Sequence, residues 1–213
     1  MSNAEKITKE TQTEIRGPGG LWETTNEDVL GENLVVFKNR HRSISEMLKA
    51  NTAQWLDREC LVLGDNRISY EELQSRVEST AYRFQSTHGI NQGDRVAILA
   101  ANCPEWVISF YAATQIGAIV SALNGWGTET EIRHAIELTD PSVIVGDTRR
   151  LARAGSLLKN FPVIDINDSP DFFEPSEEEP IETVIDEDDP ALILFTSGTT
   201  GKSKGALLSH RSL

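Results

Sequence analysis

Short apolar runs alternate with helical patterns between about residues 94 and 167, and this alternation limits the folds open to the chain. The apolar runs stand at residues 96–99, 119–123, 142–145 and 163–166. Between them, apolar residues recur at helical spacing. Strands that are buried on both faces are continuously apolar, and helices that join them cover the sheet. The pattern therefore predicts an α/β fold, with a mainly parallel sheet and helices on both of its faces.

Three elements are predicted before this alternation begins. Residues 43–54 have the apolar spacing of a short amphipathic helix, and residues 60–68 have the pattern of a β-hairpin. Ser69 and Glu72 have the spacing of a capping box, in which each side chain can bond the other residue's backbone N–H. A second capping box is predicted at 128–131, so a helix is expected to begin at each of these positions.

Composition excludes several classes of protein. The chain has 213 residues with a net charge of −13, and this acidic balance argues against general binding of nucleic acid. It has no apolar run long enough for a transmembrane segment, and no apolar stretch at its start that would indicate a secretion signal. Its two cysteines, Cys60 and Cys103, cannot form a disulfide scaffold. We expect a cytoplasmic protein.

The negative charge is concentrated in one segment. Twelve of the 33 acidic residues lie between Asp165 and Asp189, and the rest of the chain carries 21 acids against 20 bases. Four of the eight prolines lie at residues 170–190. Such a sequence disfavours both helix and packed strand, so we predict that residues 168–190 form a solvated connector. The alternative is a site for a cation or a basic partner.

These observations divide the chain into four parts. Residues 1–41 are expected to be a polar tail followed by an irregular lead-in, with a mobile stretch over residues 1–20. Residues 42–167 are the α/β sheet subdomain, and the acidic connector follows at 168–190. Residues 191–213 have the pattern of a strand, a loop and a second strand.

The loop in this last part has the composition of a phosphate-binding segment. Residues 196–205 contain three glycines, five hydroxyl side chains and two lysines. Glycine lets backbone N–H groups approach an anion, hydroxyl groups donate to phosphate oxygens, and lysine compensates the charge. We therefore expect the loop to wrap a polyphosphate.

Other interpretations of the loop fit less well. A Walker P-loop requires glycine five residues before Gly201, where Thr196 stands. A nucleophile elbow requires glycine on both sides of Ser197, and Phe195 occupies one of these positions. The remaining alternative is a polar hairpin that connects two strands without binding anything.

The segment Phe195–Gly205, FTSGTTGKSKG, closely resembles the signature loop of adenylate-forming enzymes, which include acyl-CoA synthetases, firefly luciferase and the adenylation domains of peptide synthetases. The resemblance extends over about residues 42–213. Further segments similar to this family's landmarks are SYEEL at 69–73, GDRVAI at 93–98, NCPEW at 102–106 and GAIV at 117–120. The stretch at 120–124 is more similar to acyl-CoA synthetases than to amino-acid-activating domains.

The resemblance implies an ATP-dependent acid–thiol ligase. A carboxylic acid, fatty or aryl, would attack the α-phosphate of ATP with Mg²⁺ present, and coenzyme A would then displace AMP. By position in the motif, the residues expected to bind the β- and γ-phosphates are Thr196, Ser197, Gly198, Thr199, Thr200 and Gly201, with Lys204 adding positive charge. Lys202 occupies a variable position, Ser203 stands where the family usually has proline, and His210 matches a common position to which we assign no role.

The resemblance also implies that much of the active site lies beyond this sequence. Chains of the family are longer, and their adenine pocket, ribose-binding aspartate, Mg²⁺-binding acid and adenylating lysine come later. We therefore expect an N-terminal fragment with a truncated fold that contains neither a catalytic residue nor a metal ligand and does not form an acyl-adenylate alone. The alternative function is an inactive remnant that binds nucleotide weakly or serves as an interaction module. Self-association through an exposed sheet edge is also expected.

Overall fold

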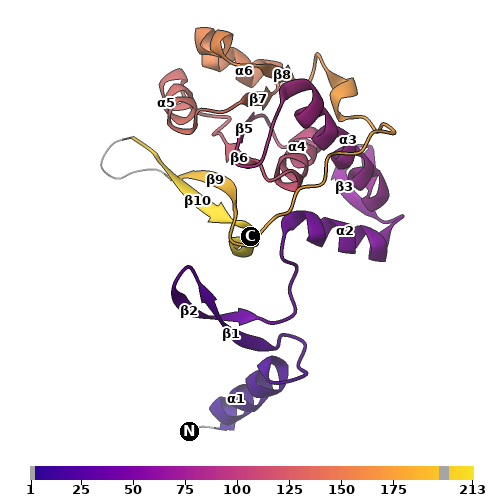
Figure 1. The fold of residues 1–213 in the computed structure, drawn as a ribbon, viewed down its shortest axis with the longest axis vertical. Helices are drawn as coiled ribbons and strands as arrows, with labels where there is room; N and C mark the ends of the chain where they lie inside the picture. The colour runs from indigo at the N-terminus through magenta and orange to yellow at the C-terminus, as the bar shows by residue number, and fades with distance from the viewer. Residues whose placement is uncertain (1–2, 197–201) are drawn as a thin grey trace. The chain divides into compact units, whose positions relative to one another are not determined.

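The computed structural model describes residues 3–196 and 202–213. The chain divides into two compact units, Met1–His41 and Arg42–Leu213 (Figure 1). Across the described residues, no helix has both the length and the apolar character that a membrane span requires.

The first unit begins with a helix where the sequence led us to expect a mobile polar tail. Helix α1 covers Asn3–Arg16, so these residues have regular structure, and the mobility of the tail stays a prediction. Lys, Glu, Gln and Arg are good helix formers, and a polar segment can therefore be helical. The glycines mark the end of the helix: the N–H of Gly17 donates to the carbonyl of Thr13 at 2.8 Å.

A hairpin completes the first unit. Strands β1 (Thr24–Val29) and β2 (Glu32–Phe37) pair in antiparallel register. Leu30 and Gly31 form the turn with φ of 53° and 89°, and two left-handed residues are what a two-residue hairpin turn of this twist needs.

The second unit opens with a helix, a hairpin and a longer helix. These are α2 (Ile44–Trp55), β3 (Glu59–Leu63), β4 (Asn66–Ser69) and α3 (Tyr70–His88). One half of the capping box predicted for α3 is present, because Ser69 Oγ accepts from the N–H of Glu72 at 3.1 Å. The carboxylate of Glu72 forms an ion pair with Arg76 at 2.9 Å.

The predicted sheet has six strands in the order β10-β9-β6-β5-β7-β8. Their bounds are β5 Arg95–Leu99, β6 Ile119–Ala122, β7 Val143–Gly146, β8 Val163–Asp165, β9 Pro190–Thr196 and β10 Lys204–Ser209. The neighbours from β9 to β8 are parallel, and β10 alone runs antiparallel to its neighbour β9. The mainly parallel sheet is therefore confirmed.

Helices cover both faces of this sheet, as predicted. The remaining helices are α4 (Pro104–Gln115), α5 (Glu129–Thr139) and α6 (Thr148–Ala154), and α6 continues into the 3-10 segment Gly155–Asn160. Along β5, Val96 and Ile98 pack with α3 and α4, whereas Ala97 and Leu99 pack with α5 and α6. Figure 1 shows these two helix pairs on opposite sides of the strands. Because neighbouring residues of a strand point to opposite faces, one apolar run supplies both cores.

The acidic connector is packed where we expected it to be solvated. A 3-10 turn, η2 (Pro170–Phe173), places Phe173 in the core with 1% of its surface exposed. The guanidinium of Arg83 on α3 donates to the carbonyls of Phe172 and Glu174, at 3.1 and 2.6 Å. The expectation of a solvated connector was therefore wrong for this end of the segment, which is held against α3.

The other end of the connector is held by ion pairs. Glu187, which is 9% exposed, lies 2.5 Å from Arg42 and 2.7 Å from Arg211. Asp188 pairs with Arg211 as well. Two acids at this end of the connector are thus paired with arginines of the same chain, Arg42 and Arg211.

Strand β10 forms one edge of the sheet. Leu207 on this strand is 58% exposed, and Leu138 on α5 is 53% exposed. An exposed strand edge beside apolar side chains can pair with another chain. Self-association through this edge stays a prediction.

Candidate phosphate-binding site

The candidate site lies at the carboxyl end of β9. Ala191 and Leu192 of this strand are buried, and β9 pairs in parallel with β6, so the two strands end at the same edge of the sheet. Strand β10 returns antiparallel, with Lys204 opposite Thr196. The segment between β9 and β10 is therefore anchored at the edge where parallel α/β sheets bind ligands.

Two of the seven predicted phosphate-binding residues belong to the described part of the chain. Thr196 is exposed, and its hydroxyl donates to the carbonyl of Lys204 at 3.4 Å. Lys204 is exposed at the first position of β10. The other five, Ser197, Gly198, Thr199, Thr200 and Gly201, lie outside the described residues.

Positive charge is available beside the loop. Lys202 and Lys204 are both exposed, and among the described residues neither ammonium group takes part in an ion pair. Lysine in this state can offset the charge of a phosphate group. The two flanks of the loop thus provide a hydroxyl group and two cations.

His134 is a residue of the site that sequence reasoning missed. It lies on α5, and its Nε2 donates to the carbonyl of Ser203 at 2.9 Å. Their separation of 69 residues in sequence left no local signal for this contact. The bond uses the backbone carbonyl, which proline also has, so it does not depend on the serine at position 203.

A cavity of about 310 Å³ adjoins the end of β9. Its lining comes from the ends of β6 and β9 and from the start of α5, and includes Asn124, Gly127, Glu131, Phe195, Thr196 and Ser203. The side-chain oxygen of Asn124 accepts from the N–H of Trp126 at 3.0 Å, which fixes the turn after β6. The polar flank of the loop therefore faces a preformed hollow.

Glu131, which lines this cavity, has a hydrogen-bond partner at the start of α5. Its carboxylate accepts from the backbone N–H of Thr128 at 2.7 Å and from the hydroxyl of Thr128 at 3.0 Å. These hydrogen bonds lower the pKa of Glu131, so it is ionised at neutral pH. The capping box predicted for 128–131 is complete, and it engages a carboxylate that would otherwise be free to interact within the cavity.

A second cavity, of about 790 Å³, opens beside the hairpin formed by β9 and β10. Leu138, Ile193 and Leu207 give it an apolar surface, and Lys202 and Lys204 belong to its lining. Apolar surface beside cationic groups suits an anion that carries an apolar part.

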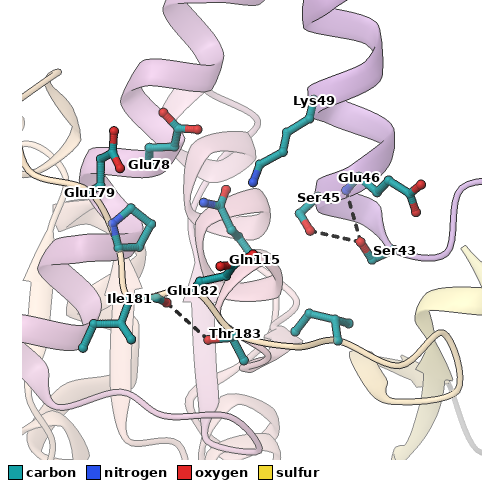
Figure 2. Close-up of a pocket in the computed structure, with 12 residues that line it drawn as sticks. Ser43, Ser45, Glu46, Lys49, Glu78, Gln115, Glu179, Ile181, Glu182 and Thr183 are labelled. Atoms are coloured by element: carbon teal, nitrogen blue, oxygen red, sulfur yellow. Dashed lines mark hydrogen bonds between the residues drawn. The ribbon is translucent and has the colours of Figure 1, made fainter.

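A third cavity, of about 490 Å³, is lined by none of the described residues of the β9–β10 hairpin. Figure 2 shows Lys49 pointing into it from α2, with Glu78 and Gln115 on neighbouring helices and Glu179 on the connector. Within residues 3–196 and 202–213, no group of three or more His, Cys, Asp or Glu side chains is placed to hold a metal ion.

Comparison with known proteins gives the family. The family model described as "AMP-binding enzyme" matches residues 48–213. Among curated proteins, 4-coumarate–CoA ligase 3 of Oryza sativa subsp. japonica is 29% identical over 204 residues, which cover 87% of this chain and 36% of that protein. Feruloyl-CoA synthase of an Amycolatopsis species is 32% identical over 155 residues, which cover 70% of this chain and 30% of that protein.

Solved structures give the same fold. The N-terminal subdomain of NpsA from Klebsiella oxytoca is 25% identical with a TM-score of 0.70, covering 81% of this chain and 43% of that one. The fatty acyl-CoA synthetase of Mycobacterium tuberculosis, at 22% identity, has a TM-score of 0.70 over 79% of this chain and 35% of that one, which shows likeness of fold. This sequence spans about a third of the length of the curated relatives named above. The chain belongs to the family of AMP-binding enzymes.

Proposed function

We propose that this chain supplies the nucleotide-phosphate-binding part of an ATP-dependent, AMP-forming acid–CoA ligase. The family assignment supports an adenylate-forming enzyme, and the names of its relatives, 4-coumarate–CoA ligase and feruloyl-CoA synthase, support coenzyme A as the acceptor. The single observation that carries the proposal is the loop of signature sequence, anchored between β9 and β10 at the carboxyl edge of the sheet.

In this proposal, residues 196–201 donate hydrogen bonds to the β- and γ-phosphates of ATP, and Lys204 offsets part of their charge. Thr196 and Lys204 are both exposed on either side of the loop, so the Lys204 ammonium can reach a phosphate, and the Thr196 hydroxyl can donate to one in place of the Lys204 carbonyl. ATP accompanied by Mg²⁺ would supply the α-phosphate that a carboxylate attacks, with release of pyrophosphate. The chain's own contribution is electrostatic. Hydrogen-bond donors that are already in place need little reorganisation when negative charge develops on the phosphate groups during the reaction.

The acid substrate is proposed from the relatives. Their names point to aryl acids such as coumarate and ferulate, and fatty acids remain the second class. Because the chain spans about a third of these relatives, the proposal assigns phosphate binding, and not the complete reaction, to residues 1–213. We therefore expect no ATP–pyrophosphate exchange above background from the isolated 213-residue chain, whereas measurable exchange would contradict this division of labour.

Thermal unfolding with Mg-ATP tests the binding role directly. Ligand binding stabilises the folded state by an amount that grows with the ratio of ligand concentration to Kd, and each kcal/mol of this stabilisation should raise Tm by roughly 2–4 °C. Lys204→Ala removes one charge-assisted contact and should weaken Mg-ATP binding about tenfold. Gly198→Ala adds a side chain to the proposed phosphate-wrapping segment and should weaken binding as well.

Lys202→Ala is the matched control. It removes the same charge two residues away, at the variable position of the motif, and should keep most of the Mg-ATP shift. Equal losses in Lys202→Ala and Lys204→Ala would indicate general charge attraction. The absence of a shift in every variant and in the unaltered chain would contradict nucleotide binding by these residues.

A further inference from the structure

His210 is a buried histidine for which the proposed phosphate binding gives no role. It begins a short 3-10 turn, η3 (His210–Ser212), directly after β10, and 6% of its surface is exposed. Its Nδ1 accepts a hydrogen bond of 3.2 Å from the backbone N–H of Ile44, the first residue of α2. These two residues are 166 positions apart, so the contact joins the end of the hairpin to a helix from the other end of the unit.

The contact provides a hydrogen-bond acceptor for a backbone N–H group at the start of α2. The first N–H groups of a helix have no acceptor within that helix and need one from outside. Ser43 Oγ accepts from the N–H of Glu46 at 3.1 Å, and His210 provides the acceptor for Ile44. Helix α2 is therefore capped by its own N-cap residue and by a side chain that follows β10.

This geometry fixes the protonation state of His210. A nitrogen that accepts from an N–H carries no proton, so the neutral ring has its proton on Nε2. Nε2 is buried and has no hydrogen-bond partner in the described part of the chain. Protonation of Nδ1 would remove the acceptor and place a positive charge at the positive end of the α2 dipole.

The charged groups around His210 come from the same segments. The backbone N–H of His210 donates to the carbonyl of Asp189, and the N–H of Arg211 donates to the carbonyl of Glu187. Beside α2, Glu46 accepts from the backbone N–H of Arg42. The segments that meet at the His210–Ile44 hydrogen bond carry six charged side chains: Arg42, Glu46, Glu187, Asp188, Asp189 and Arg211.

We propose that neutral His210 is a positioning residue, which fastens the β10 end of the phosphate-loop hairpin to the first turn of α2 and releases it on protonation. The effect on phosphate binding rests on the function proposed above, whereas the fastening does not. Burial lowers the pKa of His210, and Asp189 acts in the opposite direction without reversing the shift.

The sign of the pH effect follows from this lowered pKa. The unfolded chain takes up a proton near the ordinary histidine pKa of about 6.5, before the folded chain does. The stability contributed by the contact is therefore complete above about pH 6.5 and is lost as the pH falls toward the lowered folded pKa.

Two variants of His210 distinguish the loss of the hydrogen-bond acceptor from the effect of protonation. Asn has an amide oxygen near the position of Nδ1 and does not titrate, so His210→Asn should keep the Ile44 hydrogen bond at both about pH 7.5 and about pH 5.5. His210→Ala loses it, so at both pH values its Ile44 amide protection should be about tenfold lower, and its Tm lower by roughly 2–4 °C, than in His210→Asn. Protection of the Ile44 amide in the unaltered chain should be high at the higher pH and decrease at the lower one.

His88→Asn is the matched control, because His88 is partly buried and its pKa, like that of His210, is lowered by burial. It should leave the pH dependence of the Ile44 amide unchanged. Nitrogen-15 spectra of the imidazole give a readout without any variant, and should show Nδ1 unprotonated at about pH 7.5. At about pH 7.5, a protonated Nδ1, or equal Ile44 protection in His210→Ala and the unaltered chain, would overturn the proposal.

Binding of Mg-ATP distinguishes this proposal from the proposed function. If Ile44 protection follows His210 as described and Mg-ATP binds neither to the unaltered chain nor to any variant, the fastening stands, whereas the proposed function, and with it the positioning role for phosphate, is overturned. If Mg-ATP binds to His210→Asn more tightly than to His210→Ala, both proposals are supported. Equal Mg-ATP affinity in these two variants overturns the positioning role.

Discussion

Burial decides the chemistry of single side chains in this protein, and Cys103 is the clearest example. This residue stands at the N-cap of α4, where a thiol often has a lowered pKa because the helix dipole favours its anion. Here burial dominates, and the nearby Glu105 opposes the thiolate as well, so the pKa of Cys103 is raised to about 11. We therefore predict that Cys103 reacts slowly with electrophiles.

Alkylation tests this prediction for Cys103. At about pH 8, a pKa of about 11 in place of 9.0 leaves about a hundredfold less thiolate. Iodoacetamide should modify Cys103 correspondingly slowly in the folded protein, as followed by mass spectrometry of its peptide. Unfolding in urea serves as the control and should restore ordinary reactivity. Rapid alkylation of Cys103 in the native chain would show that the thiol is accessible and ionisable.

Residues with a local partner could be predicted from the sequence, and residues with a distant partner could not. Thr128 and Glu131 are three positions apart, so their capping box could be predicted from the spacing alone. His134 and Ser203 meet only because α5 packs against the hairpin of β9 and β10, and the local sequence of neither segment predicts this contact. His210 matched a family position, but its contact with Ile44 required the structure.

At the scale of elements, the connector shows how composition can mislead. Its acids and prolines predicted solvation, since a run of like charge repels itself. Two adjacent aromatic residues at its start, Phe172 and Phe173, contradict this, and the Phe172 ring lies 5.6 Å from that of Phe84 on α3. The average composition of the connector does not reveal two buried or partly buried aromatic residues. Arginines elsewhere in the chain also form ion pairs with some of its acids.

Truncating the aromatic anchor tests whether the connector contributes to stability. Phe173→Ala removes a fully buried ring, and such changes cost about 3–5 kcal/mol of unfolding free energy. Ile181→Ala, in the same connector at 75% exposure, should cost less than about 0.5 kcal/mol. Urea unfolding of both variants measures the difference. Similar, small losses would mean that the connector is solvated throughout, as its composition first suggested.

At the scale of the whole molecule, the α/β class could be predicted because its signal is repeated. Four apolar runs separated by helical patterns leave few alternatives to a covered parallel sheet. The order of the strands was not predictable in the same way. Strand β9, which follows the connector, pairs with β6 near the middle of the chain, and this pairing brings Thr196 at the end of β9 to the same cavity as Asn124 and Glu131. Local patterns define strands, whereas packing over the entire chain decides their neighbours.

Calorimetric titration of the chain with three ligands tests most directly whether the loop between β9 and β10 binds the β- and γ-phosphates of ATP. The ligands are Mg-ATP, Mg-pyrophosphate and AMP, and only the first two carry the phosphate groups assigned to the loop. We predict binding of Mg-ATP and Mg-pyrophosphate, weakened about tenfold by Lys204→Ala, and at least tenfold weaker binding of AMP. Binding of AMP as tight as that of Mg-ATP, or no binding of either phosphate-rich ligand, would contradict the assignment.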